Sequence, residues 1–168
     1  MQGREERELL DLRQLTGSLQ AEVEVFGQAS YDNSIGFYMV ENEQGTVIDP
    51  LTGQSLSPND PGYARAAIQG RIDLSINNDT DSLTAQIQAG SILAPYLISN
   101  STPEEFLELN PNNEAGQQPL AYFAYLGANP DEVDHVRLLG DNSWGFEDVF
   151  GGGDRDYNDL VIKMSLIA

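Results

Sequence analysis

The sequence predicts an all-β protein, an antiparallel β-sandwich of jelly-roll type with one or two short helices. Most segments alternate apolar and polar residues with a period of two, which is typical of half-buried strands. Turn-forming residues separate these segments at short intervals, and only two stretches carry helical signals. The 168 residues are enough for one domain with a sizeable core.

The expected strands follow one another along most of the chain. Two of them, Ser34–Glu41 and Gly45–Ile48, are expected to pair as a hairpin. Leu120–Leu126 is apolar on both faces, which favours a central strand. Pro95 restricts its own strand to an edge or a bulge, because proline lacks the N–H that a ladder needs. The remaining expected strands are Ala21–Val25, Leu83–Ala89, Ser91–Ile98, Val133–Leu139 and Asp159–Ile167.

Two short helices are expected between these strands. The first, Tyr63–Gln69, follows a turn rich in proline, asparagine and glycine. The second, Pro103–Leu109, begins with proline at its first position, and Thr102 and Glu105 have the spacing of a capping box.

The chain is expected to contain a single domain over residues 11–168. Residues 1–10 form a charged N-terminal segment, either helical or disordered. Met1–Leu15 is charged, whereas a secretory signal needs an apolar stretch of roughly 7–15 residues. We expect the chain to start after a removed signal segment, rather than to stay inside the cell, because of the acidic cluster described below.

The charge balance excludes several classes of function. Lysine and arginine number 8 and aspartate and glutamate 27, so 8 − 27 gives a net charge of −19. Nucleic acids and anionic membranes need basic residues that neutralise phosphate, so neither is expected as a partner. No apolar run approaches the roughly 20 residues of a spanning helix, so membrane insertion is not expected either. The absence of cysteine excludes disulfides and thiolate metal sites.

An acidic cluster near the C-terminus carries the clearest chemical signal. Five carboxylates lie close together in the sequence with a single base, Arg155: Glu147, Asp148, Asp154, Asp156 and Asp159. Like charges about 4 Å apart repel by roughly 4 kcal/mol at an effective dielectric constant near 20. The triple glycine Gly151–Gly153 can adopt positive φ angles and fold the chain back on itself. The cluster is therefore expected to bind a cation.

The spacing of the acids indicates which cation. Asp154, Asp156 and Asn158 lie at i, i+2 and i+4, like the first three ligands of an EF-hand loop, although the later EF-hand positions do not match. In an extended segment these three side chains would share one face, which continues into the core face of the following strand. Oxygen ligands and irregular geometry favour Ca²⁺ over Mg²⁺ and zinc. The alternative is an acidic surface turn without a metal.

The segment D-N-S-x-G-F occurs twice, at Asp32–Phe37 and Asp141–Phe146. Each copy is expected to be a turn that begins a strand. Two such turns lying side by side would bring Asp32 and Asp141 to the same cation. The alternative is that common turn residues recur by chance. The expected metal ligands are therefore Asp154, Asp156, Asn158 and Asp159, with Glu147 or Asp148 completing the shell and Asp32 and Asp141 as additional candidates.

Catalytic and cofactor-binding residues are not expected. His135 is the only histidine, and as part of a strand it would lie on the solvated side or at a sheet edge. The chain has no G-x-S-x-G motif, which argues against a catalytic triad. Glycosidases need two carboxylates about 5–9.5 Å apart, and the acidic spacing suits a shared cation better. Trp144 and Tyr157 lie next to the acidic cluster in sequence and are candidates for contact with a sugar ligand, or else core residues.

From about Asp11 to the C-terminus the sequence resembles the bacterial, largely cyanobacterial, domain-of-unknown-function 4114 family. The resemblance depends on Tyr31–Asn33, Gly36–Tyr38, Asp49, Thr52-Gly53, Leu93–Pro95, Tyr122–Ala124, Asn129, Asp134-His135, Leu139–Asn142, Gly145–Asp148 and Gly151–Asp159. It implies a β-rich module of secreted or cell-surface proteins with a calcium site. It implies no catalytic activity.

These observations favour a non-catalytic, calcium-binding β-sandwich module of an extracellular or cell-surface protein. Its expected partners are an extracellular glycan or another surface protein domain. The first alternative is a calcium-dependent carbohydrate-binding or adhesion module, and the second is a glycosidase-like hydrolase.

Overall fold

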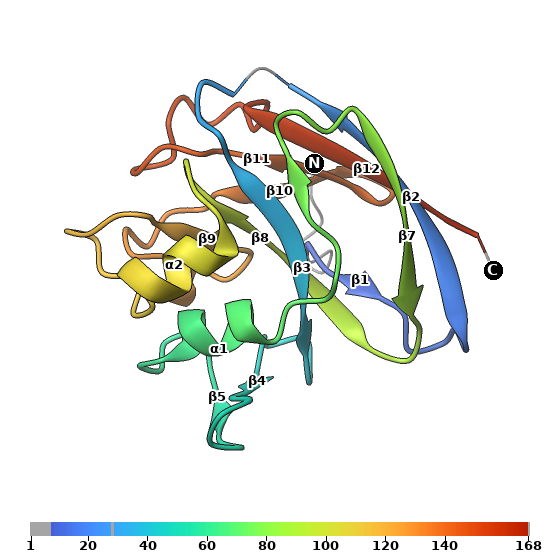
Figure 1. Cartoon of the computed structure of the whole chain (residues 1–168), viewed down its shortest axis with the longest axis horizontal. Coiled ribbons are helices and arrows are strands. Elements are labelled where there is room, and N and C mark those ends of the chain that lie inside the picture. Colours follow the sequence, from blue (N-terminus) through green and yellow to red (C-terminus); the bar gives the residue numbers. More distant parts are fainter. Residues whose placement is uncertain (1–7, 28, 168) are drawn as a thin grey trace.

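The computed structural model describes residues 8–27 and 29–167. Within them the chain forms two antiparallel five-stranded sheets that share a core (Figure 1). This confirms the predicted all-β sandwich. Sheet A consists of β1 (Leu10–Asp11), β3 (Ser34–Val40), β6 (Ile76–Asn77), β8 (Ile92–Ile98) and β9 (Ala121–Phe123). Sheet B consists of β2 (Ser18–Phe26), β7 (Ser82–Gln88), β10 (Val136–Gly140), β11 (Ser143–Phe146) and β12 (Leu160–Ile167).

Sheet B has the strand order β10-β11-β12-β2-β7 and one buried face. In β2 the side chains of Ala21 and Val23 are buried, while Glu22 and Glu24 are exposed. The same alternation continues in β12, which pairs with β2. The period of two in the sequence therefore reports which face of this sheet packs against sheet A.

Sheet A has the order β1-β8-β3-β6, with β9 beside β8, and both of its faces are covered. Every residue of β8 is buried. Leu93 and Leu97 belong to the core shared with sheet B, whereas Ala94 and Tyr96 belong to a second core. This second core lies under the helices α1 (Tyr63–Gln69) and α2 (Pro103–Leu109), which lie side by side in Figure 1.

The prediction that Pro95 lies in an edge strand or at a bulge is wrong, because β8 is central in sheet A and pairs with β3 in an unbroken register. On one side Pro95 pairs with Phe37 of β3. On the other side β1 ends its pairing at Leu93, and β9 begins its pairing at Tyr96. Pro95 therefore lies in the gap between two short neighbouring strands, where no ladder partner needs its missing N–H.

Two further predictions about strand pairing are also wrong. Ser34–Glu41 and Gly45–Ile48 do not pair as a hairpin, since β4 (Val47–Ile48) pairs with β5 (Ser55–Leu56). The apolar segment around β9 is not central, because β9 pairs only with β8. Its residues are nevertheless buried on both faces, because the two cores lie on either side of it.

Both helices have the predicted bounds. Thr102 caps α2, since its hydroxyl accepts a hydrogen bond from the Glu105 N–H at 3.2 Å. Such a cap contributes about 1 kcal/mol. The Glu105 carboxylate does not complete the capping box but accepts a hydrogen bond from the Ser101 hydroxyl at 2.5 Å. A short 3₁₀ helix, η1 (Leu126–Ala128), follows β9.

The charged N-terminal segment is only partly described, since residues 1–7 lie outside the described residues. Leu10 and Asp11 form β1 and pair with β8, so the folded structure begins before residue 11. Among the described residues, no helix combines the length and the apolar character that crossing a membrane requires.

Candidate metal centre

The acidic loop connects β11 to β12, and its first and last residues lie next to each other because these two strands are paired. The last pair of the β11–β12 ladder is Phe146 and Leu160, so the residues on either side of the loop's base face each other. Glu147 leaves the base on one side and Asp159 returns on the other. The carboxylates that are far apart in the sequence are thus brought together, as predicted.

The triple glycine makes this loop compact, as expected. Gly151, Gly152 and Gly153 have φ angles of 86°, 78° and 47°, in the left-handed region that favours glycine. A Cβ atom on Gly153 would lie 2.5 Å from Oε2 of Glu147. The backbone therefore approaches the Glu147 carboxylate more closely than any residue with a side chain would permit.

Three carboxylates form the centre of the site. Oxygens of Glu147, Asp154 and Asp156 all lie within 4.8 Å of one another, and this cluster can hold a metal ion. Asp154 and Asp156 are exposed, whereas the Glu147 side chain is 1% exposed. No ion pair among the described residues involves any of the three. We refer to Glu147, Asp154 and Asp156 as the acidic trio.

Glu147 is incompletely satisfied by the protein. Its Oε1 accepts a hydrogen bond from the Tyr157 N–H at 2.6 Å. Its Oε2 is buried and has no hydrogen-bond partner among the described residues. Burial is the largest cause of a raised pKa for Glu147, and the charges of Asp159, Asp154 and Asp156 raise it further against the opposing hydrogen bond from Tyr157. A cation beside Oε2 would relieve both effects.

Asp148 and Asp159 form a second carboxylate pair beside the trio. The Asp148 side chain accepts a hydrogen bond from Nδ2 of Asn33 at 2.7 Å, and its N–H donates to Oδ2 of Asp159 at 3.1 Å. Its carbonyl oxygen accepts from the Ser99 hydroxyl at 2.8 Å. Burial raises the pKa of Asp148, and Asp159 raises it further. These bonds attach the loop to sheet A.

The segment from Asp154 to Asn158 is not extended, contrary to the geometry considered from the sequence. Arg155 and Tyr157 have φ angles of 62° and 57°, so the chain turns at both residues. Tyr157 points inwards and is buried, although its parity predicts the opposite. Asn158 is held by Asp156, whose Oδ2 accepts from the Asn158 amide at 2.6 Å. Turns, rather than strand alternation, bring these acids together.

The two copies of D-N-S-x-G-F do not lie side by side. Asp141 precedes β11 and Glu147 follows it, so about 13 Å of strand separates Asp141 from the trio. Asp32 is exposed and lines a separate polar cavity of about 320 Å³. Only Asn33 of the first copy reaches the site, through Asp148. The carboxylate cluster found among the described residues includes neither Asp32 nor Asp141, and their participation in a cation site stays a prediction.

The C-terminal part of the chain is similar to a known family. Residues 87–166 match the family model of the domain of unknown function DUF4114. This confirms the resemblance for that range, which includes the entire acidic loop. The similar segments before residue 87, among them Tyr31–Asn33, lie outside the match. No curated protein and no solved structure matches the chain significantly.

Trp144 lies within the DUF4114 match but offers no surface to a ligand. It is fully buried, and its ring meets Phe37 edge-on with the centroids 5.2 Å apart. Its Nε1 donates to the carbonyl oxygen of Glu8 at 3.0 Å. The expectation of Trp144 as a ligand-contact residue is therefore overturned, because the side chain holds the two sheets together.

Tyr157 is likewise buried, at 2% exposure. The Arg137 guanidinium lies over its ring at 4.0 Å from the centroid, and its hydroxyl donates to the Asp134 carbonyl oxygen at 3.2 Å. Tyr157 has a structural role through two groups. Its side chain anchors the acidic loop, and its backbone N–H donates to Oε1 of Glu147. The structure thus favours the core interpretation over sugar contact.

The prediction that His135 lies in a strand, on its solvated side or at a sheet edge, is wrong. The ring is fully buried, just before β10, and stacks on Tyr122 with the centroids 3.6 Å apart. One ring nitrogen, Nδ1, lies 2.9 Å from the Glu147 carbonyl oxygen, and Nε2 lies 2.9 Å from Oδ2 of Asp131. His135 therefore holds the backbone of Glu147, a trio residue, on the buried side of the acidic loop.

Asp131 extends this support to the glycines. Its Oδ2 also accepts a hydrogen bond from the Gly151 N–H at 2.7 Å. Burial raises the pKa of Asp131, but the bonds from Gly151 and His135 outweigh burial, and the net shift is downward. Sequence reasoning missed Asp131 and His135 as positioning residues. The available signal was a single histidine four residues after an aspartate, directly before a strand.

Proposed function

We propose that this protein is a non-catalytic, calcium-binding β-sandwich module of a secreted or cell-surface protein, in which calcium orders the Glu147–Asp159 loop. One observation carries the proposal. The buried Oε2 of Glu147 has no hydrogen-bond partner among the described residues, and a carboxylate oxygen of Glu147 lies within 4.8 Å of oxygens of Asp154 and Asp156. A cation completes such a site by cancelling repulsion and by supplying the missing partner.

The chemistry of the donors favours calcium. All available ligands are carboxylate, amide or carbonyl oxygens, which suit hard cations. Glu147, Asp154 and Asp156 would hold the ion, and Asp148, Asp159 and Asn158 lie next to them. Calcium accepts six to eight ligands in irregular arrangements, so water can complete its shell beside the exposed acids. Bound calcium would supply positive charge and rigidity rather than reaction chemistry.

Two features support a non-catalytic role over the hydrolase alternative. One oxygen from each trio carboxylate lies within 4.8 Å of the others, an arrangement in which all three can share one cation. Both nitrogens of the only histidine are already engaged, by a peptide carbonyl and by Asp131.

The proposed location follows from affinity. Extracellular calcium modules typically have dissociation constants of about 10⁻⁴–10⁻³ M. A site with exposed acids and few preformed ligands belongs in this weak class, and it would fill outside the cell rather than in the cytosol. A neighbouring surface domain is the partner that an ordered loop of this kind would meet.

A thermal melt tests the proposal. Calcium should raise the melting temperature, whereas equal concentrations of magnesium should not. At a free calcium concentration of 100 times the dissociation constant the gain is about 2.7 kcal/mol. For a domain of this size that corresponds to about 5–10 °C. Glu147→Gln should abolish the gain, because it removes the buried charge that the ion neutralises.

Glu22→Gln is the matched control, since it removes an exposed carboxylate of β2 on the solvated face of sheet B. This variant should keep the full calcium effect. Identical curves with calcium and with chelator would contradict the proposal. An equal gain with magnesium would contradict the choice of calcium.

A further inference from the structure

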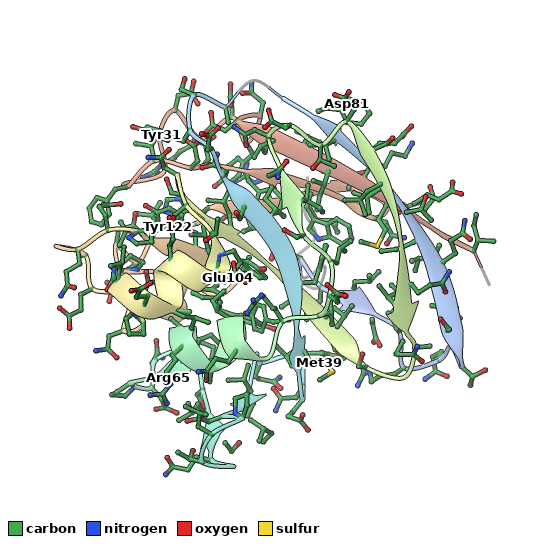
Figure 2. The ribbon with its side chains drawn as sticks, viewed as in Figure 1. Tyr31, Met39, Arg65, Asp81, Glu104 and Tyr122 are labelled. Carbon is green, nitrogen blue, oxygen red and sulfur yellow. The ribbon has the colours of Figure 1, made fainter. Side chains whose placement is uncertain are left out.

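A second site lies on the helix-covered side of sheet A. A cavity of about 380 Å³ opens between the end of α1, the start of α2 and the strand β8. Its walls include Gln69, Arg71, Tyr96 and Glu104, and Figure 2 shows Glu104 on α2. It shares no lining residue with the acidic trio. The cavity is therefore independent of the proposed calcium site.

The hydroxyl of Tyr96 is the first polar group of this cavity that could bind a ligand. The side chain is 1% exposed and lines the cavity. Its hydroxyl oxygen is not among the fully buried atoms that lack a partner, so it opens onto the cavity. By contrast, the hydroxyl of Tyr63 in the same core donates to the Gly45 carbonyl oxygen at 2.7 Å. The Tyr96 hydroxyl has no such bond to a described residue, so its hydrogen-bonding capacity is left for a molecule in the cavity.

The lack of a side chain at Gly36 leaves the space that the Tyr96 hydroxyl occupies. Gly36 and Tyr96 are paired across β3 and β8, and a Cβ atom on Gly36 would lie 2.5 Å from the Tyr96 hydroxyl oxygen. The ring can therefore lie across β3 and reach the cavity only because this position is glycine. This explains the glycine of the first D-N-S-x-G-F segment, which lies within a strand rather than in a turn.

A second unpartnered group lies on the same wall. Oε1 of Gln69 is buried and has no hydrogen-bond partner among the described residues. Next to it, Arg71 donates to Oε1 of Glu104 at 2.6 Å and to the Ile68 carbonyl oxygen at 2.8 Å. The cavity thus combines an amide, a phenol, a guanidinium and a carboxylate.

This mixture defines the class of ligand. A phenol both donates and accepts, an amide oxygen accepts, and a guanidinium only donates. The positive charge of Arg71 is matched by Glu104, and Asp73 adds a negative charge, so anions are disfavoured. Leu74 and Pro103 contribute apolar surface. Hydroxyl groups on a small carbon skeleton satisfy all of these features.

We propose that this cavity binds one unit of a neutral sugar, with its hydroxyls hydrogen-bonded to the Tyr96 hydroxyl and the Gln69 amide. The volume of about 380 Å³ is at the small end of ligand pockets, which agrees with a single sugar ring. Binding at this place does not require calcium.

Saturation-transfer NMR and calorimetry with D-glucose, D-galactose and D-mannose test the proposal on the whole chain, with chelator present. At least one of these sugars should bind, and Tyr96→Phe should weaken its binding at least tenfold. Because the hydroxyl has no protein partner, Tyr96→Phe should leave the melting temperature unchanged or higher. Gln69→Met should also weaken binding, which provides a second variant.

Tyr63→Phe is the matched control, since it removes a hydrogen-bonded hydroxyl from the same core. It should lower the melting temperature and leave sugar binding unchanged. Binding of none of the three sugars, or equal binding by Tyr96→Phe, would overturn the inference. Sugar binding that disappears with chelator or with Glu147→Gln would also overturn it, by placing the ligand at the acidic loop.

Discussion

Asp49 and Glu147 are both buried carboxylates, with exposures of 2% and 1%, but their surroundings are opposite. Asp49 accepts hydrogen bonds from the Leu51 N–H at 2.9 Å, the Thr52 hydroxyl at 3.0 Å and the Arg65 guanidinium at 2.7 Å. Figure 2 shows Arg65 on α1. Every oxygen of Asp49 therefore has a protein partner.

Among the described residues the Glu147 carboxylate has a single hydrogen-bond partner, the Tyr157 N–H, and oxygens of Asp154 and Asp156 lie close to it. The pKa of Asp49 is lowered, first of all by the Leu51 N–H, whereas burial raises the pKa of Glu147. The comparison shows that this chain can complete a buried carboxylate with its own donors. At Glu147 it does not, and that deficit is the basis for proposing a cation there.

The largest effect that would sharpen this comparison is expected from Asp49→Asn. The amide would place a donor opposite the Thr52 hydroxyl and the Arg65 guanidinium, so the melting temperature should fall by about 5 °C. Thermal melts should show the same loss with calcium and with chelator. Asp60→Asn, at an exposed turn, is the control with little expected change. A loss that calcium reverses would break the comparison.

A smaller effect is expected from Gly153→Ala. Its Cβ atom would lie 2.5 Å from Oε2 of Glu147, so the carboxylate must move. Calcium affinity measured by calorimetry should fall about tenfold, which equals about 1.4 kcal/mol. Gly151→Ala is a matched control, because its φ of 86° carries similar strain while nothing lies within 4 Å of the added atom. Equal losses in both variants would show that backbone strain, not the Glu147 contact, matters.

The smallest effect concerns pH in calcium-free protein. The raised pKa of Glu147 means that the folded state holds this proton more tightly than the unfolded state, whose value is about 4.3. Stability should therefore fall as pH rises through the interval between the two values. The lowered pKa of Asp49 has the opposite sign, since its contribution is present above the unfolded pKa and is lost as pH falls through the folded value.

Melting temperatures of the wild type, Glu147→Gln and Asp49→Asn across this acidic range measure both trends. As pH rises, the melting temperature of the wild type should fall relative to that of Glu147→Gln. Its advantage over Asp49→Asn should shrink as pH falls. Parallel curves for all three proteins would contradict the assignment of opposite shifts.

Local sequence signals were sufficient for much of the fold. The alternation in β2 and β12, the bounds of both helices and the cap at Thr102 were all predictable, because they depend on residues that are neighbours in the chain. The same is true of the reversal at Gly151–Gly153, which needs positive φ angles. The family resemblance followed from local patterns, and these also gave Asp154, Asp156 and Glu147 among a larger set of candidate ligands.

The sequence by itself therefore determined the sandwich, the helices and the crowding of carboxylates on one loop. Only the tertiary structure decided that Pro95 lies in a central strand, that Trp144 is core, and that His135 supports Glu147. It also decided that Asn33 joins the loop while Asp141 does not. These outcomes depend on which segments meet across the sheets, and burial and hydrogen bonding between distant residues are set by that packing rather than by local spacing.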